Sequence, residues 1–192
     1  MILNFTNKTN LLLRRFALAL ALILLSFNIV FAQLFPISLD QRIDQATTIL
    51  EGKVIGQTSY WDESQTHIYT SNIVEVYKVF KGQLTGKQAE IITRGGIVGN
   101  KMERVSNTLA LNLGDIGIFT AVSNTTKVIT KANLTKLKAF AGMQGFIKYN
   151  LINRSAKDVF NDYKDIVKEL HSKIITQTKT EIKTIQLAPF KI

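Results

Sequence analysis

The chain has 192 residues, with 24 Lys and Arg against 14 Asp and Glu, two His, two Pro and no Cys. A hydrophobic fraction of 46% with 20% charged residues excludes a disordered or collagen-like protein, and the length suits one domain with or without a tail. The absence of Cys from the sequence excludes disulfide frameworks, thiolate metal sites and thiol catalysis.

The N-terminal segment has the three parts of a secretory signal peptide. Residues 1–15 carry three basic side chains and no acidic one, residues 16–32 are apolar apart from two polar residues, and small residues precede a predicted cleavage between Ala32 and Gln33. We therefore expect residues 1–32 to be removed on export, which leaves a periplasmic, cell-surface or extracellular protein. The alternative is an uncleaved membrane anchor. A spanning helix needs about 20 apolar residues, however, and the apolar segment 16–32 is shorter than that and contains two polar residues.

The basic charge is concentrated in the C-terminal third. Residues 33–123 carry 8 basic and 9 acidic side chains, whereas residues 124–192 carry 13 and 5. These bases are mostly scattered Lys without interleaved aromatic residues, and no nucleic-acid-binding motif accompanies them, so we expect no nucleic-acid partner. A solvated basic surface is the favoured interpretation, and weak attraction to an anionic surface or polysaccharide is the alternative.

The first half of the mature chain predicts a short helix followed by strands. Ser38 and Gln41 have the spacing of a capping box, which predicts a helix over 38–46. The polar residues 59–65 are typical of a hairpin tip. β-Branched and alternating apolar residues predict strands over 47–56, 67–80 and 89–94.

The second half predicts more strands and one long helix. The predicted strands cover 108–113, 116–122, 127–130 and 146–149. Ser155 and Asp158 resemble a capping pair, and the apolar residues that follow, up to Ile174, have helical spacing, which predicts an amphipathic helix over 155–174. The polar residues 176–192 predict a tail or linker after a domain over 33–175. The many short strands indicate a mainly β (α+β) fold, either a small barrel or a sandwich.

The glycine-rich segment 94–101 is the most motif-like stretch of the chain. A phosphate-binding loop requires a Lys followed by Ser or Thr after its last glycine, but Asn100 follows Gly99. The dinucleotide fingerprint G-x-G-x-x-G does not occur either. We therefore interpret Gly95 and Gly96 as a turn or bulge that needs positive φ.

The two histidines offer little for catalysis or metal binding. His67 lies near Asp62 and Glu63 in sequence, but no third ligand can be assigned to a metal site there. His171 falls on the charged face of the predicted helix, where we expect it to be exposed. No H-E-x-x-H or G-x-S-x-G motif occurs in the sequence. We therefore predict no catalytic residue, no metal ligand and no cofactor.

Tyr60 and Trp61 form the one aromatic pair in a predicted exposed loop. Large amphipathic side chains at a loop tip are typical anchors for a partner or for the face of a sugar. These two residues are therefore the candidate ligand-binding residues. The alternative is that Trp61 folds over the end of the barrel as part of the core.

The central block resembles a recurrent N-terminal domain of exported Bacteroidetes-type proteins. The resemblance covers about residues 38–175 and is carried by ATTILEGKVIGQTSYWDESQTHIYTSNIVEVYKVFKG, AEIITRGGIVGN and TLALNLGDIGIFT. Such domains are similar to OB-fold and netrin-like barrels and often precede a matrixin-type metalloprotease or a type IX secretion sorting module. The resemblance implies an OB/netrin-like barrel, although this chain contains neither a protease motif nor the cysteines common in netrin-like domains.

Together these observations predict a secreted or periplasmic, non-enzymatic module that binds a protein or a glycan. It would be either a standalone protein or the N-terminal part of a larger exported one, and would contact a membrane only through an uncleaved N-terminal segment. The alternatives are an accessory domain of an exported hydrolase, associated with a metalloprotease, or a membrane-anchored envelope protein.

Overall fold

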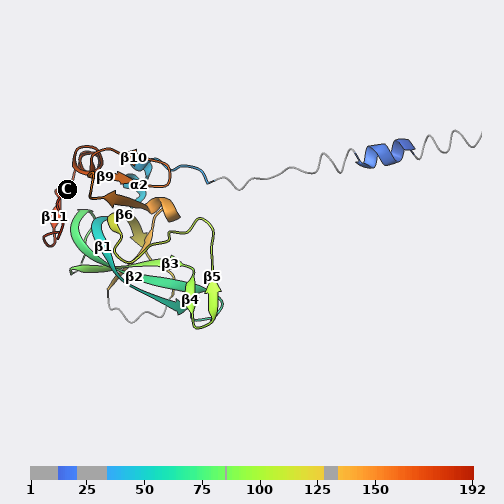
Figure 1. The fold of residues 1–192 in the computed structure, drawn as a ribbon, viewed down its shortest axis with the longest axis horizontal. Coiled ribbons are helices and arrows are strands. Elements are labelled where there is room, and N and C mark those ends of the chain that lie inside the picture. Colours follow the sequence, from blue (N-terminus) through green and yellow to red (C-terminus); the bar gives the residue numbers. More distant parts are fainter. Residues whose placement is uncertain (1–12, 21–33, 85, 128–133) are drawn as a thin grey trace, which may run out of the picture. The chain divides into compact units, whose positions relative to one another are not determined.

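The computed structural model describes residues 13–20, 34–84, 86–127 and 134–192 (Figure 1). The chain divides into two compact units, Met1–Phe35 and Pro36–Ile192. In the first unit the structure describes a helical stretch over 13–20, so most of the predicted signal peptide and its cleavage point lie outside the described residues. Among the helices that are described, none is long and apolar enough to cross a membrane.

The second unit begins with the predicted N-terminal helix, α2, which spans Leu39–Gln45. The Ser38 hydroxyl accepts a hydrogen bond from the Gln41 amide, and the Gln41 side chain accepts one from the Ser38 amide. The predicted capping box is therefore confirmed. The helix buries Ile43, and the adjoining Ala46 is buried as well.

The protein is mainly β, as predicted, and a mixed nine-stranded sheet dominates the described part of the second unit. The strands of this sheet are β1 Thr48–Trp61, β2 Ile68–Lys81, β3 Gln88–Arg94, β6 Ile116–Ser123, β7 Thr135–Ala139, β8 Phe146–Asn150, β9 Ser155–Lys157, β10 Asp162–Tyr163 and β11 Lys183–Thr184. A separate hairpin consists of β4 Gly96–Val98 and β5 Lys101–Glu103. The remaining helical elements are η1 Gly142–Gly145, η2 Ile166–His171 and α3 Ser172–Thr178.

Five strands are paired in a closed circuit. β1 pairs with β2, β2 with β3, β7 with β6, and β6 returns to β1, all of them antiparallel. The remaining link, between β3 and β7, is parallel. β1 and β2 extend well beyond the circuit as a long hairpin, because β6 pairs with β1 only from Thr48 to Lys53. β8, β9 and β10 continue the sheet from β6.

Two apolar clusters form the core. The first is built from strands of the circuit and includes Val74, Ile91 and Phe119. The second lies between the sheet and the helical elements, and includes Phe80 and Leu170. The strong strand signal over 67–80 reflects this arrangement, because β2 contributes buried side chains to both clusters.

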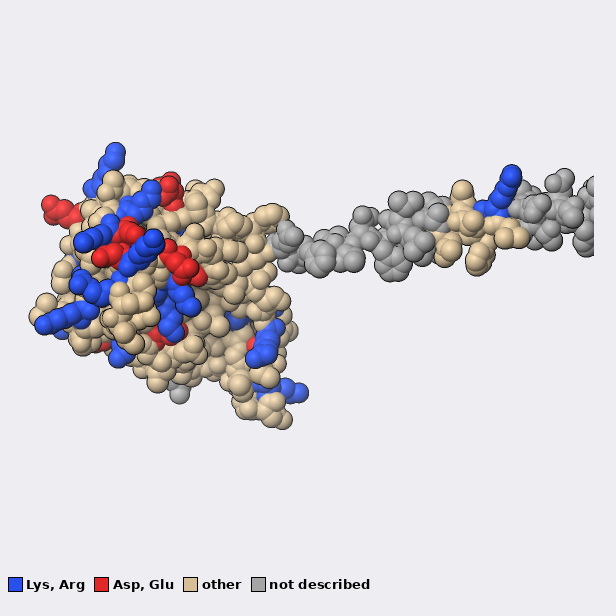
Figure 2. All heavy atoms as spheres, turned by 45° about the horizontal axis from the view of Figure 1, so that its top comes forward, with Lys and Arg blue, Asp and Glu red and all other residues tan. Residues whose placement is uncertain are grey.

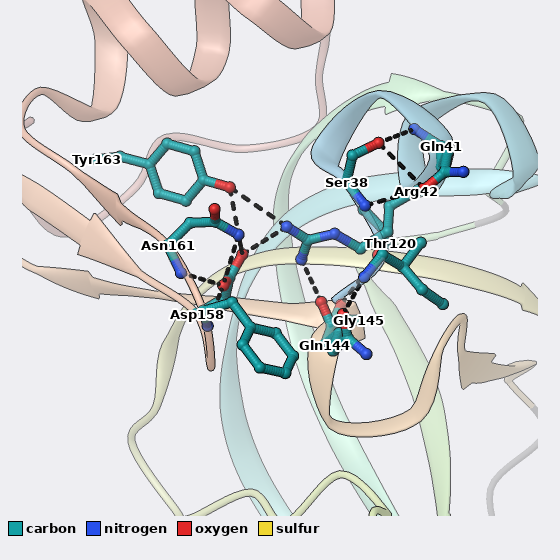
Figure 3. Close-up of polar contacts among 11 residues, drawn as sticks. Ser38, Gln41, Arg42, Thr120, Gln144, Gly145, Asp158, Asn161 and Tyr163 are labelled. Carbon is teal, nitrogen blue, oxygen red and sulfur yellow. Dashed lines mark hydrogen bonds and ion pairs between the residues drawn. The ribbon is translucent and has the colours of Figure 1, made fainter. Parts of the chain in front are cut away.

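The predicted helix over 155–174 is wrong in its first half. Ser155–Lys157 forms strand β9, and the helical segment begins only at Ile166 with a π-helical turn. The cap is Asp165, whose carboxylate accepts hydrogen bonds from the amides of Val167 and Lys168. Asp158, the expected cap partner of Ser155, instead bonds to Arg42 of α2 (Figure 3). The Asp158 carboxylate, which the predicted helix cap at Ser155 required, is therefore used in a tertiary ion pair.

Two other predictions also differ from the structure. Residues 108–113 form no strand, although Leu109 and Leu111 are buried: the segment lies against the sheet without joining its ladder. The predicted tail contains β11, which pairs with β2, and Ile182, Ile185 and Phe190 pack against the core clusters. The predicted strand over 127–130 lies, apart from Lys127, outside the described residues.

Charged side chains of both signs share one face of the molecule. Figure 2 shows Lys and Arg interspersed with Asp and Glu on the face that it presents. Lys173 illustrates the mixing, because its ammonium lies 2.7 Å from the carboxylate of Asp40. This face therefore carries charges of both signs.

Candidate ligand-binding groove

A groove of about 740 Å³ opens beside the extended part of the β1–β2 hairpin. Its floor consists of Gln57 and Ser59 from β1, Thr70 and Asn72 from β2, and Thr93 from β3. The β4–β5 hairpin and the segment 104–111 form its walls. The volume is within the range of small-molecule sites, about 300–1,000 Å³.

The floor is polar because one face of the sheet carries apolar side chains within the circuit and polar side chains beyond it. Alternate residues of a strand lie on the same face. On β2 this face runs from Val74, which is fully buried in the first core cluster, to Asn72 and Thr70. On β3 it runs from Ile91 to Thr93. The same face thus supplies an apolar core within the circuit and a polar floor beyond it.

Hydrogen bonds fix the floor side chains in place. The Gln57 amide donates to Asn72 Oδ1 and to the Leu111 carbonyl, both at 2.7 Å. Asn72 is fully buried, and its amide donates to the Ile91 carbonyl at 2.9 Å and to Thr93 Oγ1 at 3.1 Å. A buried polar group needs such partners, and once bonded in this way it is rigid. The groove therefore has a pre-organised floor of amide and hydroxyl groups.

Gly96 lets the β4–β5 hairpin approach the floor of the groove closely. Its φ of 145° lies outside the range that L side chains favour, and a Cβ atom there would collide with Ser59 Oγ and Thr70 Oγ1. Gly95 and Gly99 also have positive φ, 97° and 59°. The predicted positive φ at Gly95 and Gly96 is therefore confirmed, and the turn of the hairpin lies at Gly99 and Asn100. The hairpin carries Ile97 opposite Met102.

His67, Arg94 and Glu103 meet at the rim of the groove. Glu103 Oε1 lies 3.1 Å from Arg94 Nε and 3.3 Å from His67 Nδ1, and an Arg94 Nη2 group lies 2.9 Å from His67 Nδ1. A hydrogen bond from the Ile68 amide and the bond with the Arg94 guanidinium lower the pKa of Glu103. In the sequence Asp62 is a close neighbour of His67. In the structure the Asp62 carboxylate accepts hydrogen bonds from backbone amides of the hairpin turn.

The predicted binding residues Tyr60 and Trp61 lie in β1 next to the groove, without lining it. They pair with Tyr69 and Ile68 of β2, and both are partly buried. The turn is therefore shorter than predicted and begins after Asp62, whose amide still bonds to the His67 carbonyl. Strand alternation places Trp61 on the same face as Gln57 and Ser59, with Tyr60 on the other face. Their role in binding stays a prediction.

A second polar cluster is buried under the C-terminal helix. Tyr149 Oη lies 2.7 Å from His171 Nε2 and 3.0 Å from Glu51 Oε2, and His171 Nε2 lies 3.2 Å from the same carboxylate oxygen. The prediction that His171 is exposed is therefore wrong: its exposed fraction is 4%. The helix buries the imidazole because the carboxylate and the phenol supply its partners.

The environment of this cluster shifts two pKa values. Burial alone raises the pKa of Glu51, but its bond with His171 and the charge of Lys78 lower it overall. Burial and the adjacent carboxylate raise the pKa of Tyr149 well above its ordinary value. These residues do not line the groove described above, so we regard the cluster as structural.

The groove was not recognised from the sequence. One wall comes from the glycine-rich segment, which matches no ligand-binding motif, and the floor unites three strands that only the fold brings together. One signal was available: Thr70 and Asn72 place polar side chains on a face that is otherwise apolar in the strongest predicted strand. Among the described residues, the structure contains no group of three or more His, Cys, Asp or Glu placed to hold a metal ion.

Comparison with known proteins found no protein-family model and no curated protein that matches this chain.

Proposed function

We propose that this protein is an exported, non-enzymatic binding module that holds a glycan in the groove beside the β1–β2 hairpin. The N-terminal sequence supports export, since it combines basic, apolar and small-residue regions in the order of a signal peptide. One observation carries the binding proposal: the strand face that is apolar at Val74 and Ile91 becomes polar at Asn72 and Thr93. A strand face that served only to pack the core would carry apolar side chains along its whole length, because burying a polar group costs free energy unless the group is hydrogen-bonded.

The chemistry of the floor favours hydroxyl-rich ligands. Several backbone groups around the groove are already bonded: the carbonyls of Ile91, Gly95 and Leu111 accept side-chain hydrogen bonds. A peptide that bound through its backbone would need such groups to be available. Side-chain amides, hydroxyls and the Arg94 guanidinium provide the remaining donors and acceptors. Sugar hydroxyls suit these groups because each hydroxyl can both donate and accept.

We also propose that the five-strand circuit is an OB/netrin-like barrel. The pairings support this, since the order β1-β2-β3-β7-β6 returns to β1 and includes a parallel link between β3 and β7. In OB-type barrels the face of strands 2 and 3 and the adjoining loops bind ligands. The proposed groove involves the corresponding β2 and β3 of this protein.

A binding screen with a matched pair of variants tests the function. We would apply the purified full chain to arrays of oligosaccharides and of peptides, and compare it with Gln57→Ala and Gln83→Ala. Both glutamines are exposed, but only Gln57 lines the groove. We expect the wild type and Gln83→Ala to bind the same oligosaccharides, and Gln57→Ala to bind them at least tenfold more weakly.

Thermal unfolding of each variant shows whether lost binding reflects lost structure. Binding to peptides only would contradict the glycan proposal, and equal oligosaccharide binding by Gln57→Ala and the wild type would exclude the groove as the site.

A further inference from the structure

Arg104 places an unpaired cation in the wall of the groove. It directly follows β5, lines the groove and is exposed. Its side chain forms no hydrogen bond or ion pair with any residue that the structure describes. A guanidinium carries a permanent positive charge and five N–H donors. Arg104 therefore offers the groove a charged group whose donors are available to a ligand.

The carboxylate in the groove wall is already bonded to other groups. Among the described residues that line the groove, the acidic one is Glu103. Its Oε1 atom lies 3.1 Å from Arg94 Nε, and its Oε2 atom accepts a hydrogen bond of 2.6 Å from the Ile68 amide. Arg94 thus balances the charge of Glu103, whereas the charge of Arg104 is left unbalanced. The described lining of the groove therefore has a net positive charge.

This positive charge does not come from a basic stretch of sequence. Residues 33–123, which include the whole groove, carry 8 basic and 9 acidic side chains. The acidic residues of the neighbouring hairpin turn, Asp62 and Glu63, do not line the groove, and the Asp62 carboxylate accepts hydrogen bonds from amides of that turn. The fold therefore places a net cation in the groove of an almost neutral segment.

Two exposed apolar side chains line the same groove. Ile97 and Met102 lie directly opposite each other on the β4–β5 hairpin and are 62% and 65% exposed. Ligand sites typically combine apolar side chains with a few polar groups that fix the orientation of the ligand. The groove thus presents three kinds of surface to one ligand: a floor of amides and hydroxyls, an apolar pair and a guanidinium.

We propose that the ligand of the groove is an acidic oligosaccharide, and that Arg104 binds the carboxylate of one of its uronic acid units. This inference rests on the proposed function and names the class of glycan. A uronic acid unit has hydroxyl groups, an apolar ring face and one carboxylate, which match the three surfaces of the groove. The planar guanidinium suits a carboxylate, because the two groups can form a pair of parallel hydrogen bonds.

Matched pairs of oligosaccharides test the charge of the ligand. We would measure the dissociation constants of the purified full chain for oligomers of galacturonic, glucuronic and mannuronic acid, each beside the same oligomer after reduction of its carboxylates to neutral alcohols. The two members of a pair share their hydroxyls and ring faces and differ only in the charged group. We expect the wild type to bind at least one acidic oligomer at least tenfold more tightly than its reduced form.

Matched variants test the residue. Arg104→Gln should bind the acidic oligomer and its reduced form with affinities within about twofold of each other, because the charged partner of the carboxylate is lost. Lys101→Gln is the control: Lys101 is an exposed base on the same hairpin that does not line the groove, so this variant should keep the tenfold preference. Both positions are exposed, and thermal unfolding should show that both variants fold like the wild type.

Failure of this inference is distinguishable from failure of the proposed function. Equal binding of acidic and reduced oligomers by the wild type, or a preference that Arg104→Gln retains, would overturn the role of Arg104 and leave a glycan-binding groove. Tighter binding of sulfated neutral oligomers than of uronic acid oligomers would overturn the carboxylate as the recognised group. Binding of no oligosaccharide, or of acidic peptides alone, would instead contradict the proposed function itself.

Discussion

The guanidinium of Arg42 lies 2.5 Å from the carboxylate of Asp158, and both side chains are only 1% exposed. This pair joins α2 to the segment between β9 and β10, which lies 116 residues further along the chain (Figure 3). Arg42 also donates to the Gln144 carbonyl, and to Tyr163 Oη at 3.3 Å. Burial raises the pKa of Tyr163 to about 12, so its phenol stays protonated.

Arg42→Met should strongly destabilise the protein. It leaves the Asp158 carboxylate buried without its cation, and breaking one side of a buried ion pair costs about 3–5 kcal/mol. Urea unfolding at neutral pH measures the loss in the free energy of unfolding. Arg154→Met, the same change at an exposed arginine, is the control and should stay within about 0.5 kcal/mol of the wild type. Equal stabilities of the two variants would contradict a stabilising role for the pair.

Glu51→Gln should reduce stability in a pH-dependent way. Burial raises the pKa of Glu51, but His171 and Lys78 lower it overall. A carboxyl whose pKa is lower in the folded state contributes stability above its unfolded pKa and loses that contribution as pH falls through the folded value. The variant should therefore be about 1–3 kcal/mol less stable at pH 7.

This difference should shrink as acid protonates the wild-type carboxylate. Urea unfolding from pH 7 to pH 3 follows it, with Glu63→Gln in the exposed turn as control. A difference that stays constant over this range would show that the carboxylate charge does not matter.

Phe190→Ala should destabilise the protein although Phe190 lies near the C-terminus. The rings of Phe190 and Tyr77 form a T-shaped pair, with a centroid distance of 5.3 Å and an interplanar angle of 82°. Aromatic pairs of this geometry contribute about 0.5–1.5 kcal/mol beyond the burial of their surface. We expect a loss of about 1–3 kcal/mol by urea unfolding, because Phe190 is only partly buried.

Leu187 provides the matched control for Phe190. It lies in the same segment but is 90% exposed. Leu187→Ala should therefore leave the free energy of unfolding within about 0.5 kcal/mol. If both substitutions were neutral, the packing of this segment would not contribute to stability.

Trp61→Ala should weaken oligosaccharide binding more than Tyr60→Ala does. Trp61 lies on the groove side of β1, and Tyr60 lies on the other face. We expect at least a fivefold difference between the two variants on the same oligosaccharide. Each loses one aromatic cross-strand contact, worth about 0.2–1 kcal/mol, so thermal unfolding should change little. A larger effect of Tyr60→Ala would place the ligand on the opposite face of the hairpin.

Local patterns in the sequence determined most of the strands and the first helix. The Ser38–Gln41 capping box, the strand over 67–80 and the positive φ at Gly95 and Gly96 depend on neighbouring residues only, and the structure has all three. The mainly β fold follows from the number of such strands. Backbone geometry and hydrophobic alternation are local properties, so a single sequence can reveal them.

Tertiary contacts decided the rest. The apolar residues over 155–163 have helical spacing. Ser155 nevertheless pairs with β8 as part of strand β9, and the Asp158 carboxylate forms an ion pair with Arg42. Burial of His171 depends on Glu51, which is 120 residues away in sequence, and the groove floor exists because Gln57, Asn72 and Thr93 meet across three strands. Partners so distant in the chain leave no periodic trace in it, since their interaction depends on the fold that brings them together.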